Sequence, residues 1–241
     1  MEKIILDTTE LEYSIFESIN KESRASNNQI ENNIVLIHGG GIIADANIPL
    51  VTFSDILTKI YNILHYHRRG YGKSINKENN HIGILQQVED CREIMDFLNI
   101  KNAHIVGHSI GGTIALQLAS TYPDYINSLI LLEPAITGYN EFTNEQVIVE
   151  FQPLIQMYDK GQKNEAIDVF MKTAIGTNYK EIIANVLPSN SFELAVLDAQ
   201  TFFQEEIPSM KSWTFTKTQT KDLLHIPVLR IRGIQKSRKI S

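Results

Sequence analysis

The stretch 103–121, AHIVGHSIGGTIALQLAST, constrains the fold of this chain more than any other. It begins with a short apolar run, continues with a G-x-S-x-G pattern at residues 107–111, and ends in apolar residues at helical spacing. The pattern predicts a strand, a sharp turn and a helix, with Ser109 at the turn. Such a turn needs small neighbours, and the glycines at 107, 111 and 112 meet that need. We therefore expect the Ser109 hydroxyl to be presented as a nucleophile at the C-terminal edge of a sheet.

A second glycine-rich segment follows the apolar run at residues 34–37. This run is typical of a buried parallel strand, and it leads directly into His38-Gly39-Gly40-Gly41. Glycines after a strand let the backbone turn with its N–H groups unobstructed, which suits an oxyanion hole. A flexible turn without a catalytic role is the alternative interpretation.

Strand-like and helix-like segments alternate from residue 34 onward. This alternation predicts an α/β fold with parallel strands and right-handed crossovers, whose carboxyl ends share one edge of the sheet. Ligands bind at that edge in open α/β sheets, and we expect it to gather the glycine loop, His67, Ser109 and Glu133. The predicted strands are 34–37, 62–67, 103–108 and 126–132, the predicted helices are 53–61, 84–98 and 110–121, and segments 3–7 and 11–17 suggest a hairpin.

Helical patterns without strands occupy residues 137–220. A capping-box pattern beginning at Thr143 and a second capping pattern at Asn190 predict helix starts. An all-helical insertion at the edge that carries the site is expected to act as a lid. Strand character returns at 226–231. We therefore expect a core with the serine turn over 1–136, a helical lid over 137–220, and a returning strand with the C-terminus over 221–241.

Two further motifs are interpreted as structural. Gly72-Lys73-Ser74 ends like a phosphate-binding P-loop, but His67 stands where that motif requires glycine. His65 and His67 alternate along a strand and suggest a metal, yet no acid or further histidine follows at ligand spacing. We therefore expect a positioned loop here, with no metal site and no cofactor.

Composition narrows the classes of function and partner. The 241 residues are 43% hydrophobic and 21% charged, which suits one globular domain with a full core. The net charge of -6 and the absence of a basic patch exclude a nucleic-acid partner and favour a small-molecule substrate. No apolar run approaches the ~18 residues of a membrane span, so no membrane partner is expected.

The N-terminus and the cysteine content predict a cytoplasmic location. The first residues lack the basic and apolar regions of a signal peptide. The single cysteine, Cys91, forms no intrachain disulfide and suits a reducing compartment. Cys91 shares helical spacing with Val88 and Met95, which predicts a buried packing residue.

Taken together, the motifs resemble the α/β-hydrolase superfamily in its lid-bearing, single-domain branch. The resemblance rests on the glycine loop at 38–41, the RRGYGKS segment at 68–74, the GHSIGG turn at 107–112 and the 226–229 strand, and it covers nearly the whole chain. It implies a mostly parallel twisted sheet flanked by helices. It also implies that Ser109 is the nucleophile, that the N–H groups of Gly40 and Ile110 form the oxyanion hole, that His38 braces the glycine loop, and that His108 lies beneath the turn.

By the same resemblance, the activity is cofactor-free hydrolysis of small esters or related carbonyl compounds through a Ser109 acyl-enzyme. Family members continue past the 226–231 strand with an acid-bearing loop, a helix, a strand and the catalytic histidine. Here no acid follows Asp222 and no histidine follows His225. We therefore expect a C-terminally truncated member whose last helix and strand are missing.

Three further expectations concern the edge strand, the triad acid and the catalytic base. The strand beginning near Val228 becomes an exposed edge, which favours self-association. Glu133, placed after the strand that follows the serine helix, is the candidate triad acid. His38 and His67 are the remaining candidate bases, and a ligand-binding module without catalysis is the alternative function.

Overall fold

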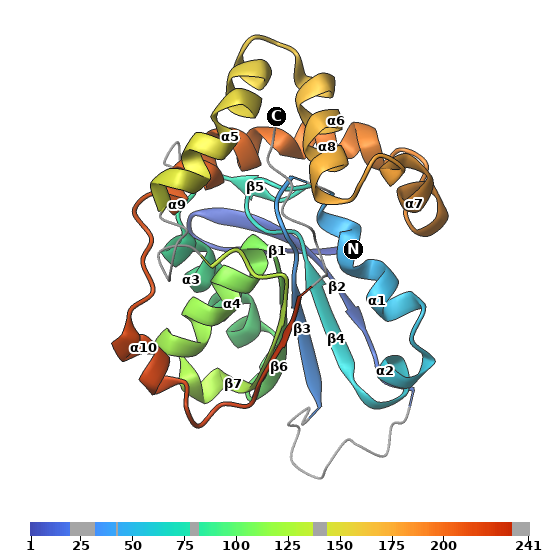
Figure 1. Cartoon of the computed structure of the whole chain (residues 1–241). Coiled ribbons are helices and arrows are strands. Elements are labelled where there is room, and N and C mark those ends of the chain that lie inside the picture. The colour runs from blue at the N-terminus through green and yellow to red at the C-terminus, as the bar shows by residue number, and fades with distance from the viewer. Residues whose placement is uncertain (20–31, 42, 78–81, 137–143, 233–241) are drawn as a thin grey trace.

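An open sheet organises the chain in the computed structural model, which describes residues 1–19, 32–41, 43–77, 82–136 and 144–232. Across these residues the strand order is β1-β2-β4-β3-β6-β7-β8, with β5 paired to β2 (Figure 1). The parallel strands are β3 (Asn33–Ile37), β4 (Asn62–Tyr66), β6 (Ala103–His108), β7 (Ile126–Leu132) and β8 (Val228–Ile231). The antiparallel strands are β1 (Glu2–Ile5), β2 (Thr9–Phe16) and β5 (Ile75–Asn76). The predicted parallel sheet and N-terminal hairpin are confirmed.

Strand β3 shows how the sheet separates two apolar layers. All of Ile34, Val35, Leu36 and Ile37 are buried, as expected for a central parallel strand. Because side chains alternate along a strand, Val35 and Ile37 join the larger core, whereas Ile34 and Leu36 pack in a smaller cluster with Val51. Both faces of β3 are therefore apolar, as expected for a parallel strand covered on both sides.

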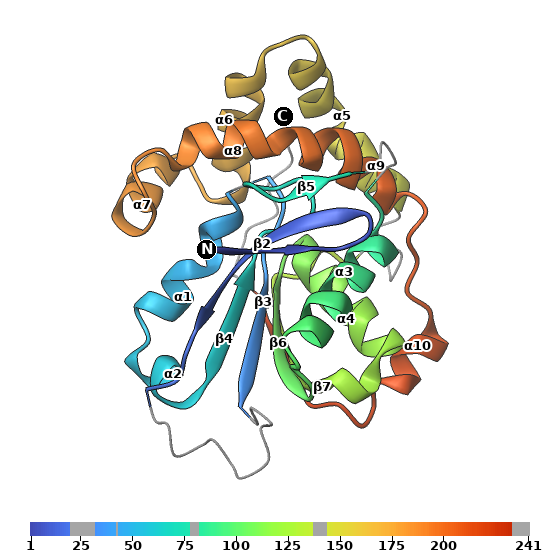
Figure 2. The same ribbon diagram turned by 180° about the vertical axis from the view of Figure 1, so that it is seen from behind.

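Long helices cover one face of the sheet, and short helices cover the other. The larger core lies under α3 (Ile84–Phe97) and α4 (Ile110–Thr121), which pack against each other (Figures 1 and 2). The smaller cluster lies under the short helices α1 (Ile48–Thr52) and α2 (Asp55–Ile60). On α3, Cys91 is fully buried as predicted, and burial raises the pKa of its thiol to about 12. The thiol therefore stays protonated near neutral pH, which agrees with a packing role.

A second apolar core forms above the carboxyl edge of the sheet. Its helices, which we call the upper helices, are α5 (Asn144–Asp159), α6 (Lys163–Ala174), α7 (Tyr179–Val186), α8 (Ser191–Gln200), the π-helical segment η4 (Thr201–Glu206) and α9 (Ile207–Met210) (Figures 1 and 2). Asn190 precedes α8 as predicted, but its side chain makes no capping hydrogen bond, so that part of the expectation is wrong. Thr143 lies outside the described residues.

The segment after the upper helices packs with the sheet-bearing part of the chain. After Met210 the chain returns to the main core, where Trp213 and Phe215 are buried. Trp213 Nε1 donates to Gln117 Oε1 of α4 over 3.1 Å, and α10 (Lys217–Asp222) lies beside α4 (Figure 1). Residues 213–220 therefore belong to the sheet-bearing part, because two large aromatic side chains bury against it.

Strand β8 is the last strand of the described sheet. It pairs with β7 only, and Val228, Leu229 and Ile231 are each about half exposed. An apolar groove of about 330 Å³ on one face of the sheet reaches from the short helices α1 and α2 to Ile130 and Leu132 of β7. The described residues thus leave this edge open, and self-association through it stays a prediction. None of the described helices combines the length and apolar character that a membrane crossing requires.

Candidate active site

Ser109 occupies the sharp turn between β6 and α4. Its backbone has φ 51° and ψ -119°, a conformation that costs energy for a residue with a side chain. Backbone hydrogen bonds hold it there: its N–H donates to Leu132 O over 2.9 Å, and its carbonyl accepts from Gly112 N at 2.9 Å and Ala135 N at 3.0 Å. The side chain is half-buried and remains accessible. The predicted strand, turn and helix around Ser109 are confirmed.

Glycine is required beside Ser109 because neighbouring backbone atoms leave no room for a Cβ. A Cβ on Gly107 would lie 2.4 Å from Gly111 O, and a Cβ on Gly111 would lie 2.3 Å from Ile37 O. Both contacts are with backbone atoms, which cannot move away cheaply. The turn therefore packs directly on the end of β3 and on the first turn of α4.

Replacement of Gly111 by alanine is expected to destabilise the protein by at least about 1–3 kcal/mol, because the new methyl group overlaps the carbonyls of Ile37 and His38. Urea unfolding followed by circular dichroism measures this change. The matched control is Gly83→Ala, since a Cβ there has no neighbour within 4 Å. Equal stability of the two variants would show that the close packing around the turn is not present in solution.

The glycine loop 38–41 lies against the serine turn. A Cβ on Gly39 would lie 3.3 Å from Ser109 Cβ, so the loop and the turn are in contact. Ile110 is the first residue of α4, where an N–H has no partner within the helix. The Gly40 N–H donates to no described backbone carbonyl. The backbone N–H groups of Gly40 and Ile110 thus belong to two segments that are in contact.

His38 is committed to holding this loop. The ring is fully buried, its Nδ1 donates to Gly39 O over 2.7 Å, and its Nε2 accepts from Arg68 N over 2.9 Å. Burial, and the charge of Arg68 beside it, hold the pKa of the imidazole well below its usual range. Both nitrogens are occupied, so His38 braces the loop and is excluded as the base for Ser109.

A buried ion pair, absent from the sequence-based expectations, holds the same loop. Arg68 Nε donates to His38 O and its Nη2 donates to Gly39 O, each over 3.0 Å. The guanidinium pairs with Glu206 of η4, and both side chains are buried. Glu206 also accepts from Gln87 Nε2 over 3.0 Å and from the Tyr71 hydroxyl. The position of Glu206 shortly after the aromatic pair Phe202-Phe203 is the signal that could have indicated this role.

Phenylalanines of the upper helices cover the glycine loop. A Cβ on Gly40 would lie 2.3 Å from the Phe202 ring, and one on Gly41 would lie 2.3 Å from the Phe170 ring. Phe170 and Phe202 are themselves in ring contact, with centroids 5.1 Å apart. The side of the loop that faces the upper helices is therefore apolar.

Three further acid–base side chains were considered as partners of Ser109: Glu133, His108 and His225. Glu133 is exposed at the end of β7 with φ 44°, and it interacts electrostatically with His108. Burial lowers the pKa of His108, and the Glu133 carboxylate partly offsets that effect. His225 is exposed just before β8, at the amino end of that strand. Among the described side chains, none forms a hydrogen bond with Ser109 Oγ.

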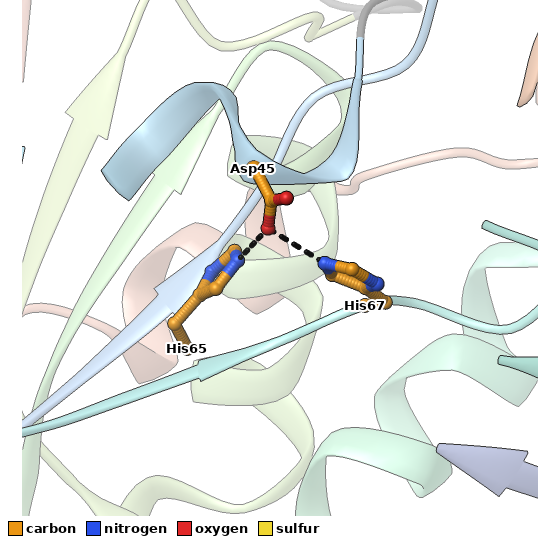
Figure 3. A group of neighbouring side chains, drawn as sticks. All are labelled: Asp45, His65 and His67. Atoms are coloured by element: carbon orange, nitrogen blue, oxygen red, sulfur yellow. Dashed lines mark hydrogen bonds and ion pairs between the residues drawn. The ribbon is translucent and has the colours of Figure 1, made fainter. Parts of the chain in front are cut away.

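His67 instead belongs to a cluster with His65 and Asp45, shown in Figure 3. Asp45 lies in the short helix η2 (Ala44–Asn47), and its Oδ1 is 3.1 Å from His65 Nε2 and 2.7 Å from His67 Nε2. These two hydrogen bonds hold the pKa of Asp45 below its usual range. Ligand spacing after the histidines does not indicate Asp45, because this acid precedes them in a separate segment of the chain.

Comparison with known proteins agrees with the geometry of the fold and the turn. A family model described as alpha/beta hydrolase fold matches residues 32–235. The match covers most of the chain, which therefore belongs to the alpha/beta hydrolase family.

Its relatives include hydrolases. The putative carbamate hydrolase RutD of Caulobacter vibrioides is 33% identical over 76 residues, which are 32% of this chain and 28% of that protein. The chain thus matches less than a third of that curated relative. Among solved structures, an alpha/beta hydrolase of Sphaerobacter thermophilus has TM-score 0.68 at 18% identity, covering 99% of this chain and 84% of that one. An enol-lactonase of Burkholderia xenovorans has TM-score 0.62 at 20% identity, covering 95% and 91%. At such identities the structural matches show the fold alone.

Proposed function

We propose that this protein is a serine hydrolase that acts on small esters or related carbonyl substrates through an acyl-enzyme on Ser109. The observation that carries the proposal is the backbone of Ser109, strained at φ 51° and held between β6 and α4 against the glycine loop. Strain that the surroundings maintain is found at functional sites, because it presents one side chain in one orientation.

The proposed reaction uses groups that meet at this turn. Ser109 Oγ attacks the substrate carbonyl carbon, and the negative charge that develops on the oxygen is stabilised by the N–H groups of Gly40 and Ile110. The positive end of the α4 dipole favours the same charge. The alcohol then leaves with a proton, and water releases the acid and restores Ser109. Glu133 is the candidate for the triad acid.

The upper helices are proposed to act as the lid that selects the substrate. Phe170 and Phe202 lie over Gly41 and Gly40, so the acyl group faces aromatic rings. Burial of an apolar group against such rings favours a hydrocarbon chain over a charged one. The name of one relative, a putative carbamate hydrolase, also supports a carbonyl substrate.

A fluorophosphonate probe tests whether Ser109 is activated. The folded protein is expected to react at Ser109, because attack on phosphorus requires the same nucleophile and the same oxyanion donors. Mass spectrometry of the peptide that carries residue 109 measures the adduct. Folded protein that remains unlabelled after prolonged exposure would exclude an activated serine.

The second candidate function is a ligand-binding module that keeps the fold and the pocket without turnover. It is favoured by one observation, that no described side chain forms a hydrogen bond with Ser109 Oγ. This alternative predicts that short-chain esters raise the thermal unfolding midpoint while no alcohol is released. Ester hydrolysis that disappears with Ser109→Ala would reject it.

A further inference from the structure

We propose that Asp45, His65 and His67 form a binding site for a divalent transition-metal ion such as Zn²⁺. Candidate ligand atoms of the three side chains lie within 4.8 Å of one another. Two imidazole nitrogens and one carboxylate oxygen are a donor set that suits zinc, with an open fourth position for water. This proposal replaces the expectation, drawn from the sequence, that no metal site exists, and it does not depend on the activity of Ser109.

The fold brings the three ligands together from separate segments. His65 and His67 are two residues apart at the end of β4, so their rings lie on one side of the chain. Asp45 comes from η2, which follows the glycine loop at the end of neighbouring strand β3. Figure 3 shows both rings directed at the same carboxylate oxygen of Asp45. The site therefore links two elements that meet only in the folded protein.

The surroundings of His67 favour a cation. Glu12 Oε2 lies 3.2 Å from its Nδ1, and Asp45 Oδ1 lies 2.7 Å from its Nε2. Carboxylate oxygens thus lie on both sides of the ring, and its buried Nδ1 makes no hydrogen bond with a described residue. An ion bound to Nε2 would lie beside Asp45 and leave Nδ1 directed towards Glu12, the carboxylate–histidine–metal arrangement common in zinc sites.

Two further features agree with a built site. His65 is fully buried, and its Nδ1 has no hydrogen-bond partner among the described residues. Asp198 of α8 interacts electrostatically with His67 and accepts a hydrogen bond from Gly72 N over 2.9 Å. Lys73 Nζ lies 3.8 Å from Glu12 Oε1, and the Lys73 side chain is largely exposed. Three carboxylates thus surround two imidazoles in a partly buried space, while the Asp45 side chain keeps 33% exposure for entry of an ion.

Cobalt binding to the purified full-length chain tests the proposal, because Co²⁺ replaces Zn²⁺ and reports its geometry by visible absorption. After chelator treatment, we expect one Co²⁺ per chain, with intense absorption typical of four- or five-coordination and no thiolate charge-transfer band. Zn²⁺ is expected to displace the cobalt and to raise the thermal unfolding midpoint. Isothermal titration calorimetry measures the stoichiometry.

Variants separate the ligands from their surroundings. Asp45→Asn and His67→Gln are expected to weaken Co²⁺ binding at least about 10-fold, and Glu12→Gln by about 10- to 100-fold, because Glu12 orients a ligand. The matched control is His225→Gln, which removes an exposed histidine outside the cluster and is expected to leave binding unchanged.

Three results would overturn the proposal. The first is no cobalt absorption and no binding heat with the folded wild-type chain, and the second is unchanged binding in folded Asp45→Asn and His67→Gln. If these variants do not fold, the wild-type experiment alone decides, since it needs no substitution. Absorption with a thiolate band would also overturn it, because no cysteine belongs to the cluster.

Discussion

Replacement of Ser109 by alanine is expected to lower kcat for short-chain p-nitrophenyl esters by a factor of at least about 10³. The methyl group removes the nucleophile but leaves the N–H groups of Gly40 and Ile110, so only oxyanion stabilisation and binding persist. In complete triads the loss reaches about 10⁶, because nucleophile and base act as a unit. The measured loss therefore also reports whether a base serves Ser109.

Release of p-nitrophenolate, with circular dichroism to confirm folding, measures this effect. The matched control is Ser120→Ala, which removes a serine near the end of the same helix, α4, and is expected to keep wild-type turnover. Equal rates for wild type and Ser109→Ala would contradict the proposed acyl-enzyme. A pH profile of the wild type then identifies the ionising group on which turnover depends.

Replacement of Glu206 by alanine is expected to destabilise the protein by about 3–5 kcal/mol, because it leaves the Arg68 guanidinium buried without its partner. The substitution also removes the carboxylate that accepts hydrogen bonds from Gln87 Nε2 and from the Tyr71 hydroxyl. The free Arg68 side chain no longer holds the carbonyls of His38 and Gly39 in place. Any ester hydrolysis by this variant is therefore expected to fall, even where the protein remains folded.

Urea unfolding of wild type and Glu206→Ala measures the change in stability. Glu193→Ala serves as the matched control, since Glu193 is exposed on α8 and its loss is expected to change stability by less than about 0.5 kcal/mol. Arg68→Met with Glu206→Leu removes both charges, and this pair is expected to recover much of the stability. A Glu206→Ala variant as stable as the control would show that the ion pair contributes nothing.

Local patterns predicted the parts of the fold that depend on neighbouring residues. The serine turn follows from glycines within a few positions of Ser109, and the strand β3 follows from its continuous apolar run. Helix α3 follows from apolar residues at helical spacing, which bury Cys91 and Met95. In each case the signal and the structure lie in the same short segment, so spacing alone carries the information.

Caps and the packing of single side chains were predicted less well, because tertiary contacts override local propensity. Trp213 and Phe215 follow a helical region, yet they pack in the main core and end the upper helices at Met210. Asn190 stands at a helix start without capping it, whereas Thr216 forms a full capping box with Gln219. A capping pattern states what a side chain can do, and the local geometry decides whether it does so.

The sequence by itself determined the family's sheet, the position of Ser109 and the glycines that its turn needs. Only the tertiary structure decided that Glu206 pairs with Arg68, 138 residues away, and that Asp45 meets His65 and His67. The physical reason is that alternation and helical spacing describe neighbours along the chain. Charged side chains from distant segments meet only when the sheet and the upper helices pack. Burial then requires each charge to be paired, because an unpaired charge in a low dielectric has a large desolvation cost.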